Sequence, residues 1–416
     1  MTRHFKLQTN LLSEIYSPSF LEKHRFDEVA FTRKRSLSFV TIISLILQKI
    51  TRSLQIEANL LGDFLKCEPV TKQALSKARY KIGVSAFQDL YESTLRMYYE
   101  DNHEGLWKGY RIFGGDGSTL QLPRRGDIPL FFGDHFKRTC LGKIMQYTEL
   151  TSDLIVAASL MPYKASEESE AKRMLPKIVS KMNLHGQTKQ IYVYDRGFPS
   201  HAFAQRHVNL GVNFLFRVQK TYSKQIEEIV RNRQEADFDV CIKRGPINYN
   251  ARVIIRYLES GHPLVLMTNL TDRRMFTEAD LVDLYRMRWR CEESYKFQKT
   301  VLQMDNSYCR CYQGVAQEFW ATVFLANLMV VAFNEEDENY NAEHPQKKTK
   351  ANRRVIFGSL KQQYLAVFLG GESVHEFNEK FRKLCRRHRV PEKPHRSFPR
   401  LSVDTRKTRH CYRRVI

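Results

Sequence analysis

Apolar residues recur at helical spacing in the N-terminal part of the chain. Between Leu37 and Leu65 they follow a period of three to four residues, and no proline interrupts them. This spacing is typical of amphipathic helices. A further helix is expected after Thr71, whose side chain is placed to cap it. We therefore predict that residues 1–105 form a helical domain.

The segment after Thr71 combines an apolar face with a basic one. Its apolar positions are Ala74, Leu75, Ala78 and Ile82. Lys72, Lys77 and Arg79 remain for solvent or for DNA. Such a helix suits the second position of a helix-turn-helix, and it equally suits an ordinary solvated helix face. Lys72, Lys77 and Arg79 are therefore candidate DNA contacts.

Short apolar runs that alternate with helical segments begin near residue 110. The predicted strands are a short apolar run within 110–122 that leads into Gly-Gly-Asp-Gly, a run around Tyr147, 154–160, 190–195 and 213–218. The predicted helices between them are 167–182 and 200–209. Three strands, a helix, and then strand–helix–strand is the order of an α/β core with a mixed sheet.

The rest of the chain is predicted to return to helices after a β insertion. Residues 219–263 form the insertion, with strands at 251–257 and 264–269 that lead back to the core. The later elements are a helix over Thr277–Leu302, a buried helix over 317–333, a loop over 334–350, an amphipathic element over 355–369 and a basic tail from Arg382. We expect three domains, at residues 1–105, 106–333 and 334–416.

The charge of the chain points to a polyanionic partner. Sixty-seven Lys and Arg residues against 45 Asp and Glu give a formal net charge of +22. Nucleic acid is the commonest partner of so basic a protein. The net charge leaves two alternatives open. The protein could bind a ribosome or a membrane surface, or its charge could serve solubility alone.

Cysteine spacing and hydropathy indicate an intracellular protein. Among the eight cysteines only Cys309 and Cys311 are close together, and a lone C-x-C lacks the spacing of a zinc site. The chain opens on polar and basic residues, and the apolar stretch Phe39–Leu47 is too short to span a membrane. We expect a soluble cytoplasmic protein with reduced thiols and no membrane contact.

One helix carries an unusual row of polar side chains. At about 100° per residue, Tyr285, Arg288, Glu292 and Lys299 project within an arc of roughly 60°. Arg288 and Glu292 also form an i,i+4 pair, so an ordinary salt-bridged surface is one interpretation. The other interpretation is a metal-binding carboxylate whose neighbours lie along a phosphate backbone. Glu293, the nearest rival carboxylate, is rotated about 100° off this row.

Two aspartates follow predicted strands and add to this interpretation. Asp116 lies among Gly114, Gly115 and Gly117, which let a backbone or a substrate approach closely. Asp195 ends the most apolar strand. Either residue alone is more often a turn or helix cap. Together with a glutamate, and without His or Cys partners, they suit Mg²⁺ or Mn²⁺.

These motifs together resemble a known family. The run Tyr285-x2-Arg288-x3-Glu292-x6-Lys299 is similar to the signature of the insertion-sequence-four family of bacterial DDE transposases. The runs 115–118 (GDGS) and 194–198 (YDRGF) resemble the first and second acidic motifs of that family. The run 396–400 (RSFPR) resembles its basic C-terminal motif.

The resemblance implies a fold and a reaction. It implies an RNase H-like mixed-sheet core with a β-strand insertion, between a helical DNA-binding domain and a helical, basic C-terminal region. Asp116, Asp195 and Glu292 would be the catalytic residues and would hold two Mg²⁺ ions, with Mn²⁺ as the alternative. Tyr285, Arg288 and Lys299 would bind phosphate. The reaction would be cleavage at transposon ends and strand transfer into target DNA.

The resemblance also implies partners and a location. The partner would be double-stranded DNA, as terminal repeats and as target, bound by a homodimer in the bacterial cytoplasm at the nucleoid. One departure concerns the tryptophan with which family members hold a flipped base in the β insertion. The tryptophans here are Trp107, Trp289 and Trp320. A tyrosine of the insertion would have to substitute: Tyr222, Tyr249 or Tyr257.

Two other functions fit parts of the pattern. One is a sequence-specific DNA-binding protein with an RNase H-like core and no activity. The other is a metal-dependent nuclease that does not join ends. Metal-dependent strand cleavage separates the transposase from the first, and joining of the cut end to target DNA separates it from the second.

Overall fold

The computed structural model describes residues 2–33, 35–48, 53–66, 70–100, 105–133, 139–186 and 189–392. The chain forms two compact units. Unit 1 comprises residues 1–101, 120–142 and 296–416, and unit 2 comprises residues 102–119 and 143–295. These units are defined by contacts and not by function. The predicted division into a DNA-binding, a catalytic and a C-terminal domain stays a prediction.

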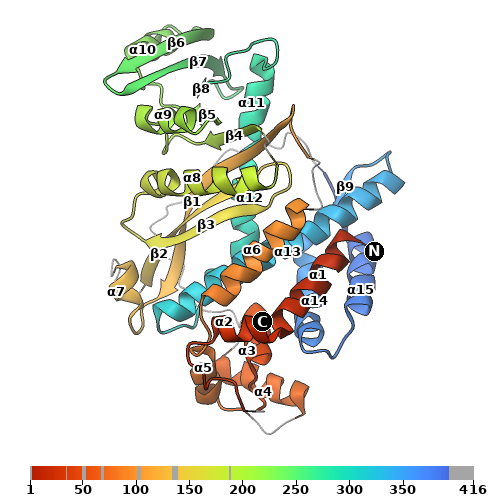
Figure 1. Ribbon diagram of the computed structural model, residues 1–416. Helices are drawn as coiled ribbons and strands as arrows, with labels where there is room; N and C mark the ends of the chain where they lie inside the picture. Colours follow the sequence, from red (N-terminus) through yellow and green to blue (C-terminus); the bar gives the residue numbers. More distant parts are fainter. Residues whose placement is uncertain are drawn as a thin grey trace. The chain divides into compact units, whose positions relative to one another are not determined.

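Unit 2 is organised around one eight-stranded sheet with the order β3-β2-β1-β4-β5-β8-β7-β6 (Figure 1). The strands are β1 (Tyr110–Pro123), β2 (Thr139–Glu149), β3 (Ile155–Pro162), β4 (Lys189–Tyr194), β5 (Asn213–Arg217), β6 (Ala236–Arg244), β7 (Ile247–Tyr257) and β8 (Pro263–Thr268). β1, β4 and β5 run parallel, whereas β5, β8, β7 and β6 pair antiparallel. The α/β class with a mixed sheet is confirmed, and the RNase H-like identity of this core stays a prediction.

Helices cover both faces of the central strands. α8 (Glu167–Leu184) packs against β3, α9 (His201–Asn209) against β5 and β7, and α11 (Glu278–Met287) against β5. Alternate residues of β4 and β5 therefore enter different cores. Val193 and Leu215 pack with Leu281 and Leu284 of α11. The residues that enter the other, aromatic core are Tyr192, Tyr194, Phe203, His207, Phe214 and Phe216.

The predicted β insertion is part of the main sheet. β7 and β8 confirm the two strands expected there, and α10 (Lys224–Arg231) precedes them. The sequence analysis did not predict β6. Its side chains alternate between exposed and half-buried positions and none is fully buried, so its strand character depends on pairing with β7 from Ala236↔Ile255 to Arg244↔Ile247.

Unit 1 is mainly helical. Its helices are α1 (Arg3–Tyr16), α2 (Pro18–His24), α3 (Phe39–Leu47), α4 (Leu54–Leu65), α5 (Lys72–Arg79), α6 (Ser85–Glu100), α7 (Ile128–Phe132), the π-helical turn η1 (Phe297–Val301), α13 (Tyr312–Glu343), α14 (Arg353–Phe368) and α15 (Val374–Arg387). Two short strands, β9 (Thr349–Ala351) and β10 (Arg389–Pro391), pair antiparallel. The segment predicted as helical over Leu37–Leu65 contains two helices, which begin at the caps Ser38 and Ser53.

α13 is the core helix of unit 1. Among the described residues, α13 is the one helix that is long and apolar enough to span a membrane. However, 94% of its most apolar 18-residue segment is buried within the structure. It packs against α1, α3, α6 and α15. The buried helix expected over 317–333 is therefore confirmed. The cysteines of the described residues, Cys140, Cys241, Cys291, Cys309, Cys311 and Cys385, are free thiols.

Two C-terminal predictions are wrong. The loop expected over 334–350 is largely helix, because α13 continues to Glu343. Its polar side chains have partners there, since Glu335 accepts the backbone amides of Arg3 and His4. The basic tail expected from Arg382 begins as the end of α15, which opens on a capping box between Ser373 and Glu376. The run 396–400 lies outside the described residues.

Candidate active site

The pairing of β1 with β4 brings the two predicted aspartates together. The parallel ladder runs from Tyr110↔Lys189 to Gly115↔Tyr194. The next residue along each chain is Asp116 and Asp195, so the two carboxylates are neighbours at the carboxyl end of this ladder. β1 itself continues to Pro123, so Asp116 does not end its strand as predicted. The pairing with β4 ends there instead.

The glycines around Asp116 allow three side chains to approach β1. A Cβ on Gly114 would overlap the Sγ of Cys291, and one on Gly117 would overlap the carboxyl group of Glu167. A Cβ on Gly115 would lie 2.5 Å from Cε1 of Tyr194. The glycines were predicted to admit a backbone or a substrate. In the structure they admit side chains of Cys291, Tyr194 and Glu167.

The helix predicted over Thr277–Leu302 is divided at Arg288. α11 begins at Thr277, which forms a capping box with Asp280. Arg288 caps the end of α11, and α12 (Trp289–Lys296) follows it directly. The amide of Arg288 donates to the carbonyl of Tyr285, and the amide of Cys291 donates to the carbonyl of Arg288. Arg288, at this junction, lies near both Glu292 and Asp116.

Arg288 pairs with two of the three acids. Its Nη2 lies 2.8 Å from Oε1 of Glu292, and its Nη1 lies 3.6 Å from Oδ2 of Asp116. The Arg288 side chain is 9% exposed. Burial opposes its charge, but Tyr285, Glu292, Asp116 and Asp195 together raise the pKa of Arg288, which therefore stays charged. One guanidinium is thus shared by two of the three acids.

Asp195 is held in its ionised form. Burial by itself would raise the pKa of Asp195, but the backbone amide of Arg196 and the charge of Arg288 outweigh it. The hydroxyl of Tyr285 also donates to Oδ1 of Asp195 at 3.0 Å, and Nη1 of Arg217 lies 3.9 Å from that atom. The net pKa of Asp195 is below its usual range.

Asp116 has the opposite tendency. Burial raises the pKa of Asp116 to about 6, against the lowering effects of Arg288 and the amide of Gly117. The nearby charges of Glu292 and Asp195 raise it further. Tyr295 fixes the backbone here, since its hydroxyl donates to the carbonyl of Asp116 at 2.8 Å. Two adjacent aspartates with opposed pKa shifts are characteristic of functional sites.

The acidic side chains are of the type that binds a hard divalent ion, but they do not yet converge on one point. Carboxylate oxygens without His or Cys partners are the ligands that Mg²⁺ and Mn²⁺ prefer. Cys291 does not compete, because burial raises the pKa of its thiol. Among the described residues no three His, Cys, Asp or Glu side chains converge closely enough to hold an ion as they stand. Asp116 and Glu292 converge on Arg288 instead.

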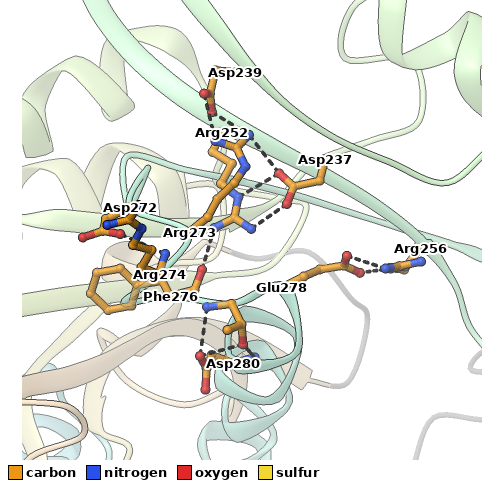
Figure 2. A network of polar contacts seen from close by, with 11 residues as sticks. Asp237, Asp239, Arg252, Arg256, Asp272, Arg273, Arg274, Phe276, Glu278 and Asp280 are labelled. Atoms are coloured by element: carbon orange, nitrogen blue, oxygen red, sulfur yellow. Dashed lines mark hydrogen bonds and ion pairs between the residues drawn. The ribbon is translucent and has the colours of Figure 1, made fainter.

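The start of α11 is anchored to the β insertion by a polar network (Figure 2). Arg252 of β7, 1% exposed, donates from Nε and Nη2 to Asp237 of β6 at 2.8 and 2.6 Å. Its Nη1 donates to the carbonyl of Phe276 at 2.6 Å, immediately before the capping residue of α11. Arg256 pairs with Glu278 in the first turn of α11. These contacts set the position of the helix that carries Tyr285.

The remaining predicted residues lie in unit 1. Lys299 is in η1, where the wider π-helical turn changes the angular spacing that a regular helix would have. Lys72 and Lys77 are exposed on α5, as predicted. Thr71 caps α5 and accepts from the amide of Ala74, also as predicted, although Ala74 itself is exposed.

The solvent-facing position predicted for Arg79 is wrong. Arg79 is 6% exposed and its guanidinium is fully used within unit 1. It donates to Oε1 of Gln317 at 2.9 Å, to Oε1 of Glu318 at 3.0 Å and to the carbonyl of Gly314 at 2.8 Å. Arg79 is four residues after the buried Leu75 and lies on the same face of α5, from which it reaches α13.

Four residues of the site were missed by sequence reasoning. Arg217 ends the third parallel strand, beside the strand that carries Asp195, and that position was a usable signal. Tyr295 follows the row of Arg288 and Glu292 closely along the same helix. Nothing local distinguished Cys291 or Arg252, because their roles depend on β1 and β6.

The aromatic residues proposed for base holding have protein partners. Tyr249 is buried and its hydroxyl lies 2.9 Å from Nδ1 of His201, and Tyr257 donates to the carbonyl of Val230. Tyr222 lies at hydrogen-bond distance from the same atom of His201. Trp289, beside Arg288, is 54% exposed. Whether a tyrosine holds a base stays a prediction.

Comparison with known proteins identifies the family. A family model described as "Transposase DDE domain" matches residues 116–328, more than half of the chain. The match begins at Asp116 and includes Asp195 and Glu292. The chain belongs to the transposase DDE domain family. DDE transposases act on DNA with divalent metal ions, so the acidic cluster lies in the catalytic domain of an enzyme of DNA transposition.

Other comparisons are weaker than this family match. No curated protein matches the chain. The chain is similar to a solved structure described as a piggyBac transposase synaptic complex with hairpin DNA, with a TM-score of 0.48 and 9% sequence identity. That similarity covers 95% of this chain and 86% of the other. With so low a sequence identity and TM-score, this similarity adds nothing to the family assignment.

Proposed function

We propose that this DDE transposase is of the insertion-sequence-four type and that it cuts at transposon ends and joins them to target DNA. The observation that carries the proposal is the position of the acids. Asp116 and Asp195 follow the last paired residues of two parallel strands, and Asp116 and Glu292 pair with the same guanidinium. Acids that far apart in sequence gather in this way when they serve one site.

In this proposal the acids would hold two Mg²⁺ ions, with Mn²⁺ as the alternative. When bound, such ions lower the pKa of an attacking water or DNA 3′-hydroxyl and stabilise the charge of phosphoryl transfer. Asp195 is ready to bind, because its pKa is already low. Asp116 has to lose a proton near pH 6 first. Tyr285 orients Asp195, and Arg288 and Lys299 bind the phosphates beside the cut.

Unit 1 supplies further DNA contacts in this proposal. Lys72 and Lys77 are exposed on one helix and are free to reach phosphates. Arg79 contributes by fixing α5 against α13. The complex would contain two copies of the chain, one for each transposon end, bound to double-stranded DNA at the bacterial nucleoid.

The test is a cleavage and joining assay on candidate terminal-repeat duplexes with Mg²⁺. Asp116→Asn, Asp195→Asn and Glu292→Gln should each abolish cutting while DNA binding persists. Glu293→Gln is the matched control, because it removes an exposed carboxylate one residue from Glu292 and should cut normally. Loss of DNA binding in all three acid variants would mean that the acids serve only the fold.

The same assay separates the alternatives. Cutting without transfer of the cut end into a target plasmid would identify a nuclease. DNA binding without cutting, in Mg²⁺ and in Mn²⁺, would identify a binding protein with an inactive core. The adjacency of Asp116 and Asp195 favours the transposase over the binding protein, since a protein that only binds DNA gains nothing from burying two acids side by side.

A further inference from the structure

Arg288 occupies an unusual position between the acids. Its charged group is nearly buried and contacts Glu292 at 2.8 Å and Asp116 at 3.6 Å. It also lies against the ring of Tyr285, with Cζ 5.8 Å from the ring centroid. Its Nε is buried and has no hydrogen-bond partner among the described residues. The two terminal nitrogens of Arg288 are thus paired with carboxylates, whereas its Nε lacks a hydrogen-bond acceptor within the described part of the chain.

These contacts make Arg288 a competitor for the carboxylates. A carboxylate oxygen that accepts from a guanidinium directs its lone pairs to that partner. A divalent ion at the same oxygens would also face a positive charge a few ångströms away, in surroundings that screen it poorly. Asp116 and Glu292 therefore cannot serve Arg288 and a divalent ion fully at the same time.

We propose that Arg288 is an internal counter-ion that must move away from Asp116 and Glu292 before divalent ions bind there. This proposal rests on the proposed function, because it concerns the same three acids. Arg288 is placed to move, since it lies between α11 and α12 and caps the end of the former. Its unsatisfied Nε is a ready donor for an anionic oxygen, and a guanidinium suits two oxygens of one phosphate.

The consequence is a link between DNA and metal. A DNA phosphate that accepts from Arg288 would free the acids and so raise their affinity for the ions. By thermodynamic linkage, anything that draws Arg288 away must increase metal affinity, and removal of its charge must do the same. A transposase built in this way would load its ions poorly until DNA is in place.

Removal of the Arg288 charge tests this directly in the DNA-free protein. Mn²⁺ affinity would be measured from the electron paramagnetic resonance signal of free Mn²⁺. A neighbouring charge changes the proton affinity of a carboxylate by about ten- to a thousandfold, so Arg288→Gln should bind Mn²⁺ at least about tenfold more tightly than wild type. Arg288→Lys keeps the charge and should stay closer to wild type.

Arg290 provides the matched control. It lies two residues from Arg288, is 45% exposed and pairs with Asp153. Arg290→Gln removes the same unit of charge two residues away, and its Mn²⁺ affinity should stay within about twofold of wild type, since exposed charges are screened. An equal gain in both Gln variants, or an equal gain in Arg288→Gln and Arg288→Lys, would overturn the proposal.

A second measurement covers variants that fold poorly. Removal of Arg288 leaves the acids without a counter-ion, so Arg288→Gln should melt earlier than wild type in EDTA. Saturating Mn²⁺ should then raise its melting temperature by more than it raises that of wild type. An equal or smaller rise would contradict the proposal even where affinities are hard to measure.

Adding Asp116→Asn to each protein separates this inference from the proposed function. If Asp116→Asn weakens Mn²⁺ binding in wild type and Arg288→Gln gives no gain, the acids bind metal and the counter-ion role of Arg288 is wrong. If Asp116→Asn leaves Mn²⁺ binding unchanged in both backgrounds, the proposed metal site itself is wrong. The expected result is a gain in Arg288→Gln that Asp116→Asn abolishes.

Discussion

The hydroxyl of Tyr285 donates to Oδ1 of Asp195 at 3.0 Å, so a residue of α11 orients the acid that follows β4. This bond contributes to the low pKa of Asp195. It connects the helix with Arg288 and Glu292 to the neighbouring strand, across 90 residues of sequence. The geometry of the acidic cluster therefore depends on where α11 begins and on what anchors it.

Loss of this hydroxyl should lower the rate of cleavage. Tyr285→Phe removes a donor that lowers the pKa of Asp195, so that pKa should rise. The acidic limb of the pH–rate profile should stay near pH 6, where Asp116 loses its proton, and the rate at neutral pH should fall on the order of tenfold, as for one lost hydrogen bond to a charged group. Tyr257→Phe, which removes a hydroxyl bonded to the Val230 carbonyl, is the control. Identical profiles for both variants would mean that Tyr285 only packs.

The raised pKa of Asp116 predicts that its carboxylate destabilises the fold when divalent ions are absent. The native pKa is about 6, above the usual value of 3.8, so the native state binds more protons than the unfolded chain between these pH values. This contribution to stability is complete below about pH 4 and is lost as the pH rises through 6. In EDTA at pH 7.5, Asp116→Asn should raise the free energy of unfolding by about 1–3 kcal/mol.

Urea unfolding at pH 7.5 and at pH 4 checks this sign. The difference between Asp116→Asn and wild type should largely disappear at pH 4, where the native carboxyl is protonated and the unfolded carboxyl, with a pKa of 3.8, is partly protonated. A less stable Asn variant at pH 7.5 would show instead that the pairing with Arg288 outweighs burial.

Lys299 should matter for the reaction and hardly for stability. Lys299→Ala should leave the melting temperature nearly unchanged, because a partly exposed Lys contributes about 0–1 kcal/mol through ion pairs. A phosphate displaced by 1 Å lowers a rate on the order of a hundredfold, so cleavage or joining should fall by that amount. Lys296→Ala, three residues earlier and exposed, is the control for a general loss of charge. Normal single-turnover cutting by Lys299→Ala would remove this residue from the site.

The basic residues of α5 should differ in what they contribute, since Lys72 and Lys77 should serve DNA binding and Arg79 should serve stability. Replacing Lys72 and Lys77 by Ala should weaken DNA binding, keep the melting temperature, and lower the slope of log affinity against log salt by about one for each lost phosphate contact. Arg79→Ala should instead lower the free energy of unfolding by ~3–5 kcal/mol, because it leaves Glu318 buried without its partner. Fluorescence anisotropy over a salt series, beside thermal melts, measures both. An unchanged salt slope in the double Lys variant would exclude α5 from the DNA interface.

The network at the start of α11 gives a further stability prediction. Arg252→Met should lower the free energy of unfolding by about 3 kcal/mol or more, because Asp237 and the Phe276 carbonyl lose a buried donor. Arg273→Met is the matched control, since Arg273 reaches the same aspartate but is 41% exposed and should cost about 0–1 kcal/mol. Denaturant unfolding of both variants decides it, and equal losses would show that burial of Arg252 is not what matters.

Local sequence determined the elements that carry the chemistry. The apolar run before Asp195, the glycines around Asp116 and the cap at Thr277 act over a few residues, so the strands and the start of the catalytic helix followed from them. The row of Tyr285, Arg288 and Glu292 followed from helical periodicity. The polar end of α13 did not follow, because partners from a distant segment stabilise it. The start of α15 was missed although its capping box between Ser373 and Glu376 is local.

Tertiary structure alone decided which of these residues meet. The register of β1 against β4 makes Asp116 and Asp195 neighbours, and a shift by one residue would turn one of them to the other face of the sheet. The sequence pattern assigned Arg79 to solvent or DNA, and only its hydrogen bonds to Gln317 and Gly314 of α13 show that it is buried. The pairing of Arg288 with Asp116 joins residues 172 positions apart in the chain. No local pattern encodes such a contact, because its energy arises only when the strand, the helix and the low-polarity surroundings come together.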